Sequence, residues 1–186
     1  MPKIILGFTG LIASGKDASK KYLEAKYGAK SFRFSTILRD VLSRLDVTIT
    51  RDNMITLSTW ARETFGQDLL ARVIAKDVTN AKEEIIVVDG IRRLPDIEHL
   101  NKISGFVLIS IDADPKKRYN RMLNRNENEG DAQKTMADFL ADHQKETELT
   151  IPEVMAAAKY KINNNGTIEE LYAQIDKIIA DIKKSA

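Results

Sequence analysis

The fold is decided by residues 3–17, which read Lys3-Ile4-Ile5-Leu6-Gly7-Phe8-Thr9-Gly10-Leu11-Ile12-Ala13-Ser14-Gly15-Lys16-Asp17. The first seven residues form a nearly continuous apolar run, which is typical of a strand buried on both faces. The following residues match the pattern G-x-x-x-x-G-K, and a helical stretch extends to about residue 26. A strand, a glycine-rich turn and a helix in this order predict a loop that binds phosphate.

Each fixed residue of that pattern has a physical role in binding an anion. Gly10 and Gly15 allow backbone conformations and close approaches that a Cβ atom would block. The backbone N–H groups turn inward, and the helix that follows points its positive end at the phosphates. Lys16 supplies a compact positive charge for the β- and γ-phosphates. The residues expected to contact the nucleotide here are Gly10, Ala13, Ser14, Gly15, Lys16, Asp17 and Ala18.

Asp17 departs from the usual motif, in which Ser or Thr follows the lysine and ligates Mg²⁺. A carboxylate is also a Mg²⁺ ligand, although Asp17 is equally a favourable first-turn helix residue. Asp89 ends the clearest strand, Glu84-Ile85-Ile86-Val87-Val88-Asp89, and is the second candidate for holding Mg²⁺. The sequence therefore predicts a metal site at Asp17 and Asp89.

Strands and helices alternate along the rest of the chain. Apolar runs predict further strands at 29–34, 106–111 and 158–163, and helical patterns occupy 36–45, 53–65, 67–81, 94–103, 131–148, 167–184 and the residues after Pro115. Ser35 is the expected N-cap of the helix over 36–45. This alternation predicts an α/β three-layer fold in which helices flank a five-stranded parallel sheet, with the ligand at the carboxyl ends of the strands.

The composition excludes several classes of protein. The 186 residues hold 29 Lys+Arg and 27 Asp+Glu, a net charge of +2, which argues against a nucleic-acid or membrane-surface binder. There is no cysteine and there are two histidines, so disulfides, thiolate nucleophiles and multi-histidine metal sites are not expected. No apolar run approaches the length of a membrane span, and no signal peptide is evident, so we expect a cytoplasmic protein.

No His, Ser or Cys is obviously placed as a covalent nucleophile. Instead, several arginines come after the predicted strands. They are Arg39, Arg92, Arg93, Arg118, Arg121 and Arg125. Positioning and charge neutralisation by such groups perform most of the catalysis in phosphoryl transfer from a nucleoside triphosphate. An acceptor that is itself a phosphate is ionised at pH 7 and needs no general base.

These motifs resemble the P-loop nucleoside monophosphate kinase group, most closely the archaeal-type nucleotide kinases related to dephospho-CoA kinase and adenylate kinase. Residues 34–39 are similar to the acceptor-binding segment, and residues 89–92 to the family's D-G-x-R. The resemblance implies that Arg39 and Arg92 or Arg93 hold the acceptor phosphate, with Arg93 in register with D-G-F-P-R. The lid arginines would be Arg118, Arg121 and Arg125. Residues 158–167 resemble A-D-x-x-I-x-N-x-G-S, which would place Asn164 and Gly166 near the ATP base.

The resemblance also implies one kinase domain over residues 1–186, with an acceptor-binding insertion at about 35–80 and a lid at about 118–147. ATP and Mg²⁺ are the implied cofactors, and a small phosphorylated molecule is the implied partner of a monomer or small homo-oligomer. Two departures stand out. The Gly-Lys-Asp form is similar to phage deoxynucleotide kinases and animal phosphomevalonate kinases, and Asp142-His143 replaces the Arg-Asp that is usual in the archaeal-type lid.

The leading hypothesis is an ATP-dependent kinase for a nucleoside or deoxynucleoside monophosphate. Dephospho-CoA and phosphomevalonate are alternative acceptors. A nucleotide-binding ATPase or GTPase module is the alternative of another class, although Asn101-Lys102-Ile103-Ser104 lacks the aspartate of the guanine motif Asn-Lys-x-Asp. Met54, Leu57, Trp60 and Ala61 have helical spacing, which favours core packing of Trp60 over contact with an acceptor.

Overall fold

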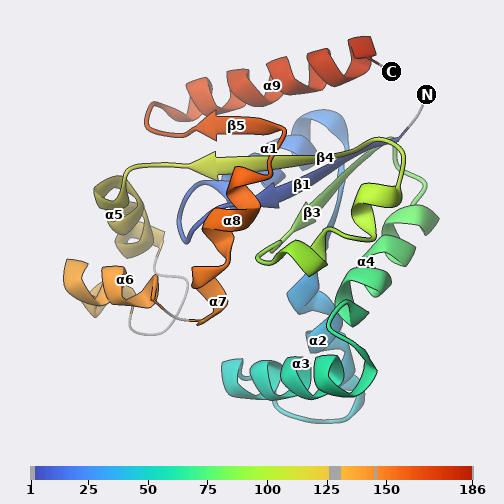
Figure 1. Ribbon diagram of the computed structural model, residues 1–186. Helices are drawn as coiled ribbons and strands as arrows, with labels where there is room; N and C mark the ends of the chain where they lie inside the picture. Colours follow the sequence, from blue (N-terminus) through green and yellow to red (C-terminus); the bar gives the residue numbers. More distant parts are fainter. Residues whose placement is uncertain (1–2, 126–130, 145, 186) are drawn as a thin grey trace.

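The computed structural model describes residues 3–125, 131–144 and 146–185. Its centre is a parallel five-stranded sheet in the order β2-β3-β1-β4-β5 (Figure 1). The strands are β1 (Ile4–Thr9), β2 (Lys30–Arg33), β3 (Ile85–Asp89), β4 (Phe106–Asp112) and β5 (Tyr160–Asn163). The predicted α/β fold with a five-stranded parallel sheet is confirmed.

The strand register brings chemically important residues to one edge of the sheet. Arg33 at the end of β2 pairs with Asp89 at the end of β3, and Asp112 at the end of β4 pairs with Asn163 in β5. Because all strands run in the same direction, their carboxyl ends meet where β1 enters the phosphate loop.

Helices cover both faces of the sheet, and the side chains on the two faces of β1 pack into two separate hydrophobic cores. Leu6 and Phe8 pack on the face covered by α1 (Lys16–Tyr27) and α9 (Ile168–Ser185). Ile5 packs on the opposite face, against α4 (Leu69–Asn80) and α8 (Ile151–Ala156). This two-sided burial explains why β1 is apolar at nearly every position. None of the helices in the described ranges is long and apolar enough to span a membrane.

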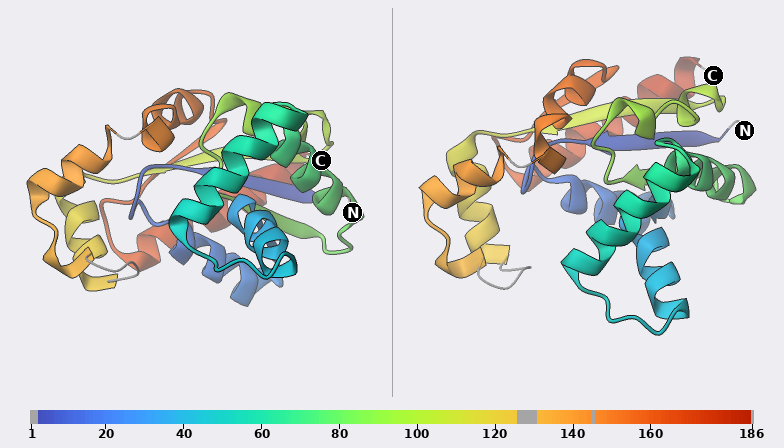
Figure 2. Two further views of the ribbon diagram at one scale, coloured as in Figure 1. Left: turned by 90° about the horizontal axis from the view of Figure 1, so that it is seen from below. Right: turned by 60° about the horizontal axis from the view of Figure 1, so that its bottom comes forward.

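Two helical segments extend beyond these layers. Helices α2 (Phe34–Arg44) and α3 (Arg51–Phe65) lie together on the β2–β3 side, whereas α5 (Pro115–Arg125) and α6 (Met136–Asp142) lie together beyond β4 (Figures 1 and 2). They fall within the ranges predicted for an acceptor-binding insertion, about 35–80, and a lid, about 118–147, and those two roles stay predictions. Residues 126–130 and 145 of that lid lie outside the described residues.

The expected start of α2 is wrong. The helix begins at Phe34, directly after the extended residue Arg33, and no side chain caps its first turn. Ser35 is therefore a helical residue and not the N-cap. By contrast, a side chain does cap α3, since the Thr50 hydroxyl accepts a hydrogen bond from Asn53 N at 3.1 Å.

The single helices predicted over 94–103 and over 131–148 are also wrong. Residues 94–103 form 3₁₀ turns at Leu94–Asp96 and Leu100–Lys102, because Asp96 accepts hydrogen bonds from the backbone after β3. Residues 131–148 divide into a 3₁₀ turn, α6 and α7 (Glu146–Leu149), since the cap at Thr135 starts a separate helix. Helix α8 was not predicted.

Candidate active site

The phosphate loop joins β1 to α1 and depends on its two glycines. Gly10 has φ +147° and Gly15 has φ +116°, both in a region that L-residues rarely adopt. A Cβ atom on Gly10 would lie 2.2 Å from the backbone oxygen of Ile111, and one on Gly15 would lie 2.1 Å from Asn164 Nδ2. Ala13 also has a positive φ of 58°. The glycines are therefore required for the conformation of the loop and for its packing.

Lys16 folds over the loop that it follows. Its Nζ donates hydrogen bonds to the carbonyl oxygens of Gly10 at 2.6 Å and Leu11 at 3.0 Å. The residue keeps some exposure, but its ammonium is packed in by protein. Burial lowers the pKa of Lys16 to about 8, against the opposing attraction of Asp89. An anion in the loop would offset this cost.

Replacing Lys16 by methionine is expected to raise the free energy of unfolding of the ligand-free protein by about 1 kcal/mol at pH 7, because a desolvated ammonium is removed. The gain in unfolding free energy of Lys16→Met over the wild type should be at its full size below about pH 8. Between there and the ordinary lysine pKa of 10.5, the unfolded chain holds a proton that the folded chain has lost, so the wild type gains stability as the pH rises. Urea unfolding at pH 7 and pH 10 measures both effects, and a gain that grew with pH would contradict this account.

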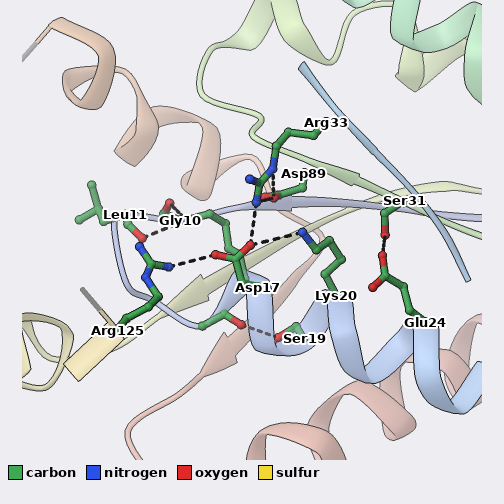
Figure 3. A network of polar contacts seen from close by, with 12 residues as sticks. Gly10, Leu11, Asp17, Ser19, Lys20, Glu24, Ser31, Arg33, Asp89 and Arg125 are labelled. Carbon is green, nitrogen blue, oxygen red and sulfur yellow. Dashed lines mark hydrogen bonds and ion pairs between the residues drawn. The ribbon is translucent and has the colours of Figure 1, made fainter. Parts of the chain in front are cut away.

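The carboxylates of Asp17 and Asp89 both attract the Lys16 ammonium. Arg33 lies between these two carboxylates (Figure 3). Arg33 Nη2 donates to Asp17 Oδ1 at 2.7 Å and to Asp89 Oδ2 at 2.6 Å, and its Nε donates to Asp89 Oδ2 at 2.9 Å. Arg125 Nη1 lies 3.0 Å from Asp17 Oδ2, and Lys20 Nζ lies 3.4 Å from Asp17 Oδ1. Partial burial alone would raise the pKa of Asp17, but Arg33, Lys20 and Arg125 outweigh it and lower that pKa.

The residues around Asp17 and Asp89 fit a Mg²⁺ ion. Asp89 is 2% exposed, and its Oδ1 has no hydrogen-bond partner among the described residues. Carboxylate oxygens are the ligands that Mg²⁺ prefers, and the ion usually completes its shell with water and substrate phosphates. The described ranges contain no group of three or more His, Asp or Glu residues that could hold a metal ion.

The predicted lid arginines converge on the phosphate loop from α5. Arg118 is buried, with Nε donating to Ala113 O at 3.0 Å and Nη1 to Ile12 O at 3.3 Å. Arg121 Nη2 donates to Asn164 O at 2.9 Å, while its Nη1 is buried without a partner among the described residues. Their spacing along one helix, together with Arg125, gives α5 a cationic face toward the loop.

The loop after β5 is attached directly to the phosphate loop. Asn164 is 5% exposed, and its Nδ2 donates to Ser14 O at 2.7 Å while its backbone N–H donates to Asp112 O at 2.7 Å. Ser14 Oγ is buried, with no partner in the described ranges. The predicted nucleotide residue Asn164 is thus placed beside the loop, and Gly166 lies farther along, next to the Glu170 side chain.

The three arginines expected to hold the acceptor phosphate differ in their contacts. Arg92 Nη1 pairs with Glu148, which precedes α8, and Arg93 Nη2 lies 3.5 Å from Asp96 Oδ1. Arg39 is exposed on α2, without a hydrogen bond or ion pair to another described residue. The structure therefore does not bring Arg39 to the phosphate loop.

Two residues of this site need the structure to be recognised. Arg33 lies near the end of the short strand predicted at 29–34, as Asp89 ends its own predicted strand, but Arg33 was not among the expected arginines. His143 is half-buried, and its Nε2 lies 2.9 Å from Arg118 Nη1. Burial and then Arg118 lower the pKa of His143, so that a neutral ring accepts the arginine's hydrogen bond. The lid thus keeps a polar contact at the position where it departs from the family pattern.

A strand, a phosphate loop, a helix and an aspartate at the end of the neighbouring strand define a P-loop NTPase, here with a kinase-like fold. A model of the AAA domain family AAA_18 matches residues 6–148, and the chain belongs to this family. It is similar over almost its whole length to archaeal UPF0200 proteins. That of Staphylothermus marinus is 31% identical, with 92% of this chain and 89% of the relative covered, and that of Sulfurisphaera tokodaii is 29% identical, with 96% and 97% covered.

Solved structures share the fold at low sequence identity. Shikimate kinase from Bacteroides thetaiotaomicron superposes with a TM-score of 0.66 at 15% identity, covering 97% of this chain and 98% of that one. TT1252 from Thermus thermophilus superposes with a TM-score of 0.63 at 14% identity, with the same coverage. These likenesses show a P-loop kinase fold for the chain.

Proposed function

We propose that this protein is an ATP-dependent kinase that phosphorylates a small phosphorylated acceptor, foremost a nucleoside or deoxynucleoside monophosphate. One observation carries the proposal: cationic side chains from separate strand ends gather around a phosphate loop. Lys16 comes from the loop, Arg33 from β2, and Arg118, Arg121 and Arg125 from α5. Such an arrangement suits the transfer of a phosphoryl group between two anions.

The transfer forms one bond and breaks another. An oxygen of the acceptor phosphate bonds to the γ-phosphorus of ATP, the bond from that phosphorus to the β–γ bridging oxygen breaks, and ADP leaves with the electron pair. Lys16 and the α5 arginines neutralise the phosphates, and no proton needs to move when the acceptor is ionised. Mg²⁺ held by Asp89 and Asp17 would supply further charge neutralisation at the phosphate oxygens.

The acceptor-binding segment favours an acceptor that carries an aromatic base. Trp60 and Phe65 are each 54% exposed and meet edge to face with ring centroids 5.5 Å apart. The prediction that Trp60 packs in the core is therefore wrong, although Ala61 on the same helix is buried. Exposed aromatic rings can stack on a nucleobase, which phosphomevalonate lacks. We further propose that residues 1–186 act as one kinase domain.

A coupled ADP-release assay over a panel of acceptors tests the proposal. The panel contains the ribo- and deoxynucleoside monophosphates, dephospho-CoA and phosphomevalonate, each with ATP and Mg²⁺. We expect one nucleoside monophosphate class to raise ADP release well above the rate with ATP alone. No stimulation by any acceptor, together with ATP hydrolysis that RNA stimulates, would favour a nucleic-acid ATPase instead. Much tighter binding of GTP than of ATP would favour a regulatory GTPase.

A further inference from the structure

Arg33 connects the two candidate metal ligands through a single atom. Its Nη2 contacts an oxygen of Asp17 and an oxygen of Asp89, so the two carboxylates lie side by side (Figure 3). Asp17 stands on the first turn of α1, and Asp89 ends β3. The guanidinium thus joins the phosphate loop to the neighbouring strand end.

The contact with Arg33 offsets the negative charge that Asp17 adds to the phosphate loop. The usual serine or threonine at this position is neutral, whereas Asp17 adds a negative charge next to the place where phosphates would bind. Lys20 and Arg125 also contact Asp17, but in the described part of the chain only Arg33 contacts Asp89 as well. Arg33 is therefore the cation that hydrogen-bonds both carboxylates, whereas Lys16 attracts both through its charge alone.

One carboxylate oxygen beside the arginine is left without a hydrogen-bond partner. Arg33 binds only Oδ2 of Asp89, and the buried Oδ1 has no partner among the described residues. A buried carboxylate oxygen without a partner is costly, which indicates that another group occupies that side when the site is filled.

We propose that Arg33 is a positioning residue that acts through Asp17 and Asp89, holding the carboxylates together and neutralising them so that the phosphates of ATP can approach. The inference rests on the proposed function, because it takes ATP as the ligand of the phosphate loop. It assigns Arg33 a role that depends on the presence of an aspartate at position 17.

Calorimetric titration of ATP without divalent metal tests this dependence directly. Arg33→Met is expected to weaken ATP binding about 10-fold, because one counter-charge beside the phosphates is lost. In an Asp17→Ser background the same replacement should change ATP affinity by less than about 3-fold, since the carboxylate that the motif places next to the phosphates is gone and only Asp89 remains. With Mg²⁺ present, the loss in Arg33→Met should shrink, because the ion neutralises the same carboxylates.

Further variants keep the test informative. Arg33→Lys retains the charge and should bind ATP within about 3-fold of the wild type, and a loss of about 10-fold in this folded variant would contradict charge balance as the role of Arg33. If Arg33→Met fails to unfold cooperatively in urea, Arg33→Gln takes its place, because it also removes the charge. Arg44→Met removes an exposed arginine at the end of α2 and should leave ATP affinity unchanged.

Three other outcomes would count against the inference in distinguishable ways. Unchanged ATP affinity in Arg33→Met overturns it. An equal loss in the Asp17→Ser background also overturns it, because Arg33 would then act independently of Asp17. If the wild type itself does not bind ATP, the proposed function fails and this inference fails with it.

Discussion

Replacing Lys16 by methionine is expected to lower kcat/KM for phosphoryl transfer about 10³-fold. The ammonium lies over the phosphate loop on the carbonyl oxygens of Gly10 and Leu11, from which it can turn to the β- and γ-phosphates. Methionine has a similar length but no charge, so the transferred group would lose its nearest loop cation. The rate is measured by coupled ADP release with the acceptor that the panel identifies.

Lys21→Met provides the matched control for this experiment. Lys21 is exposed on the same helix, and the change removes the same charge away from the loop. We expect wild-type rates from this variant. A folded Lys16→Met protein with wild-type transfer would contradict the kinase assignment, because Lys16 would then have no part in binding the phosphates.

Replacing Gly10 by alanine is expected to cost about 3 kcal/mol or more of unfolding free energy and to abolish ATP binding. The new Cβ would lie 2.2 Å from the backbone oxygen of Ile111 and 2.8 Å from Ser14 Oγ, at a φ of +147°. Because Ile111 belongs to β4 in the middle of the sheet, the backbone cannot yield without disturbing the phosphate loop or the strand. Urea unfolding measures the first effect, and calorimetry measures the second.

Gly28→Ala separates backbone strain from the steric clash. Gly28 ends α1 with a φ of +63°, but a Cβ there would meet nothing within 4 Å. Its replacement should therefore cost only about 1 kcal/mol and leave ATP binding intact. Equal losses in the two variants would show that the contact with Ile111 is unimportant.

The strands and the phosphate loop were predictable because each carries its own local signal. The apolar run of β1 is buried on both faces, and β3 is β-branched along its length. The loop pattern likewise depends on glycines at positions where the backbone must have positive φ. In these segments local preference and tertiary packing favour the same structure.

The sequence-based predictions were wrong where a tertiary contact overrode the local pattern. A short helix was expected over residues 94–103, but the Asp96 carboxylate accepts hydrogen bonds from the backbone N–H groups of Arg92 and Arg93 and turns the chain after β3. Trp60 follows a helical apolar stripe, yet α3 lies at the margin of the fold and leaves this ring exposed. Periodicity indicates which face of a helix is apolar, but not whether another element covers it.

The sequence by itself determined the sheet, the phosphate loop, and the identity of Lys16, Asp17 and Asp89 as candidate site residues, because motif and strand end coincide in each. Only the tertiary structure revealed that Arg33 binds Asp17 and Asp89 together, although it is 16 residues from one and 56 from the other. Parallel pairing of β2 with β3 aligns Arg33 with Asp89, and the turn after β1 brings Asp17 to the same edge. Which cation balances which carboxylate depends on the spatial order of strands, and that order is set by packing between segments far apart in the chain.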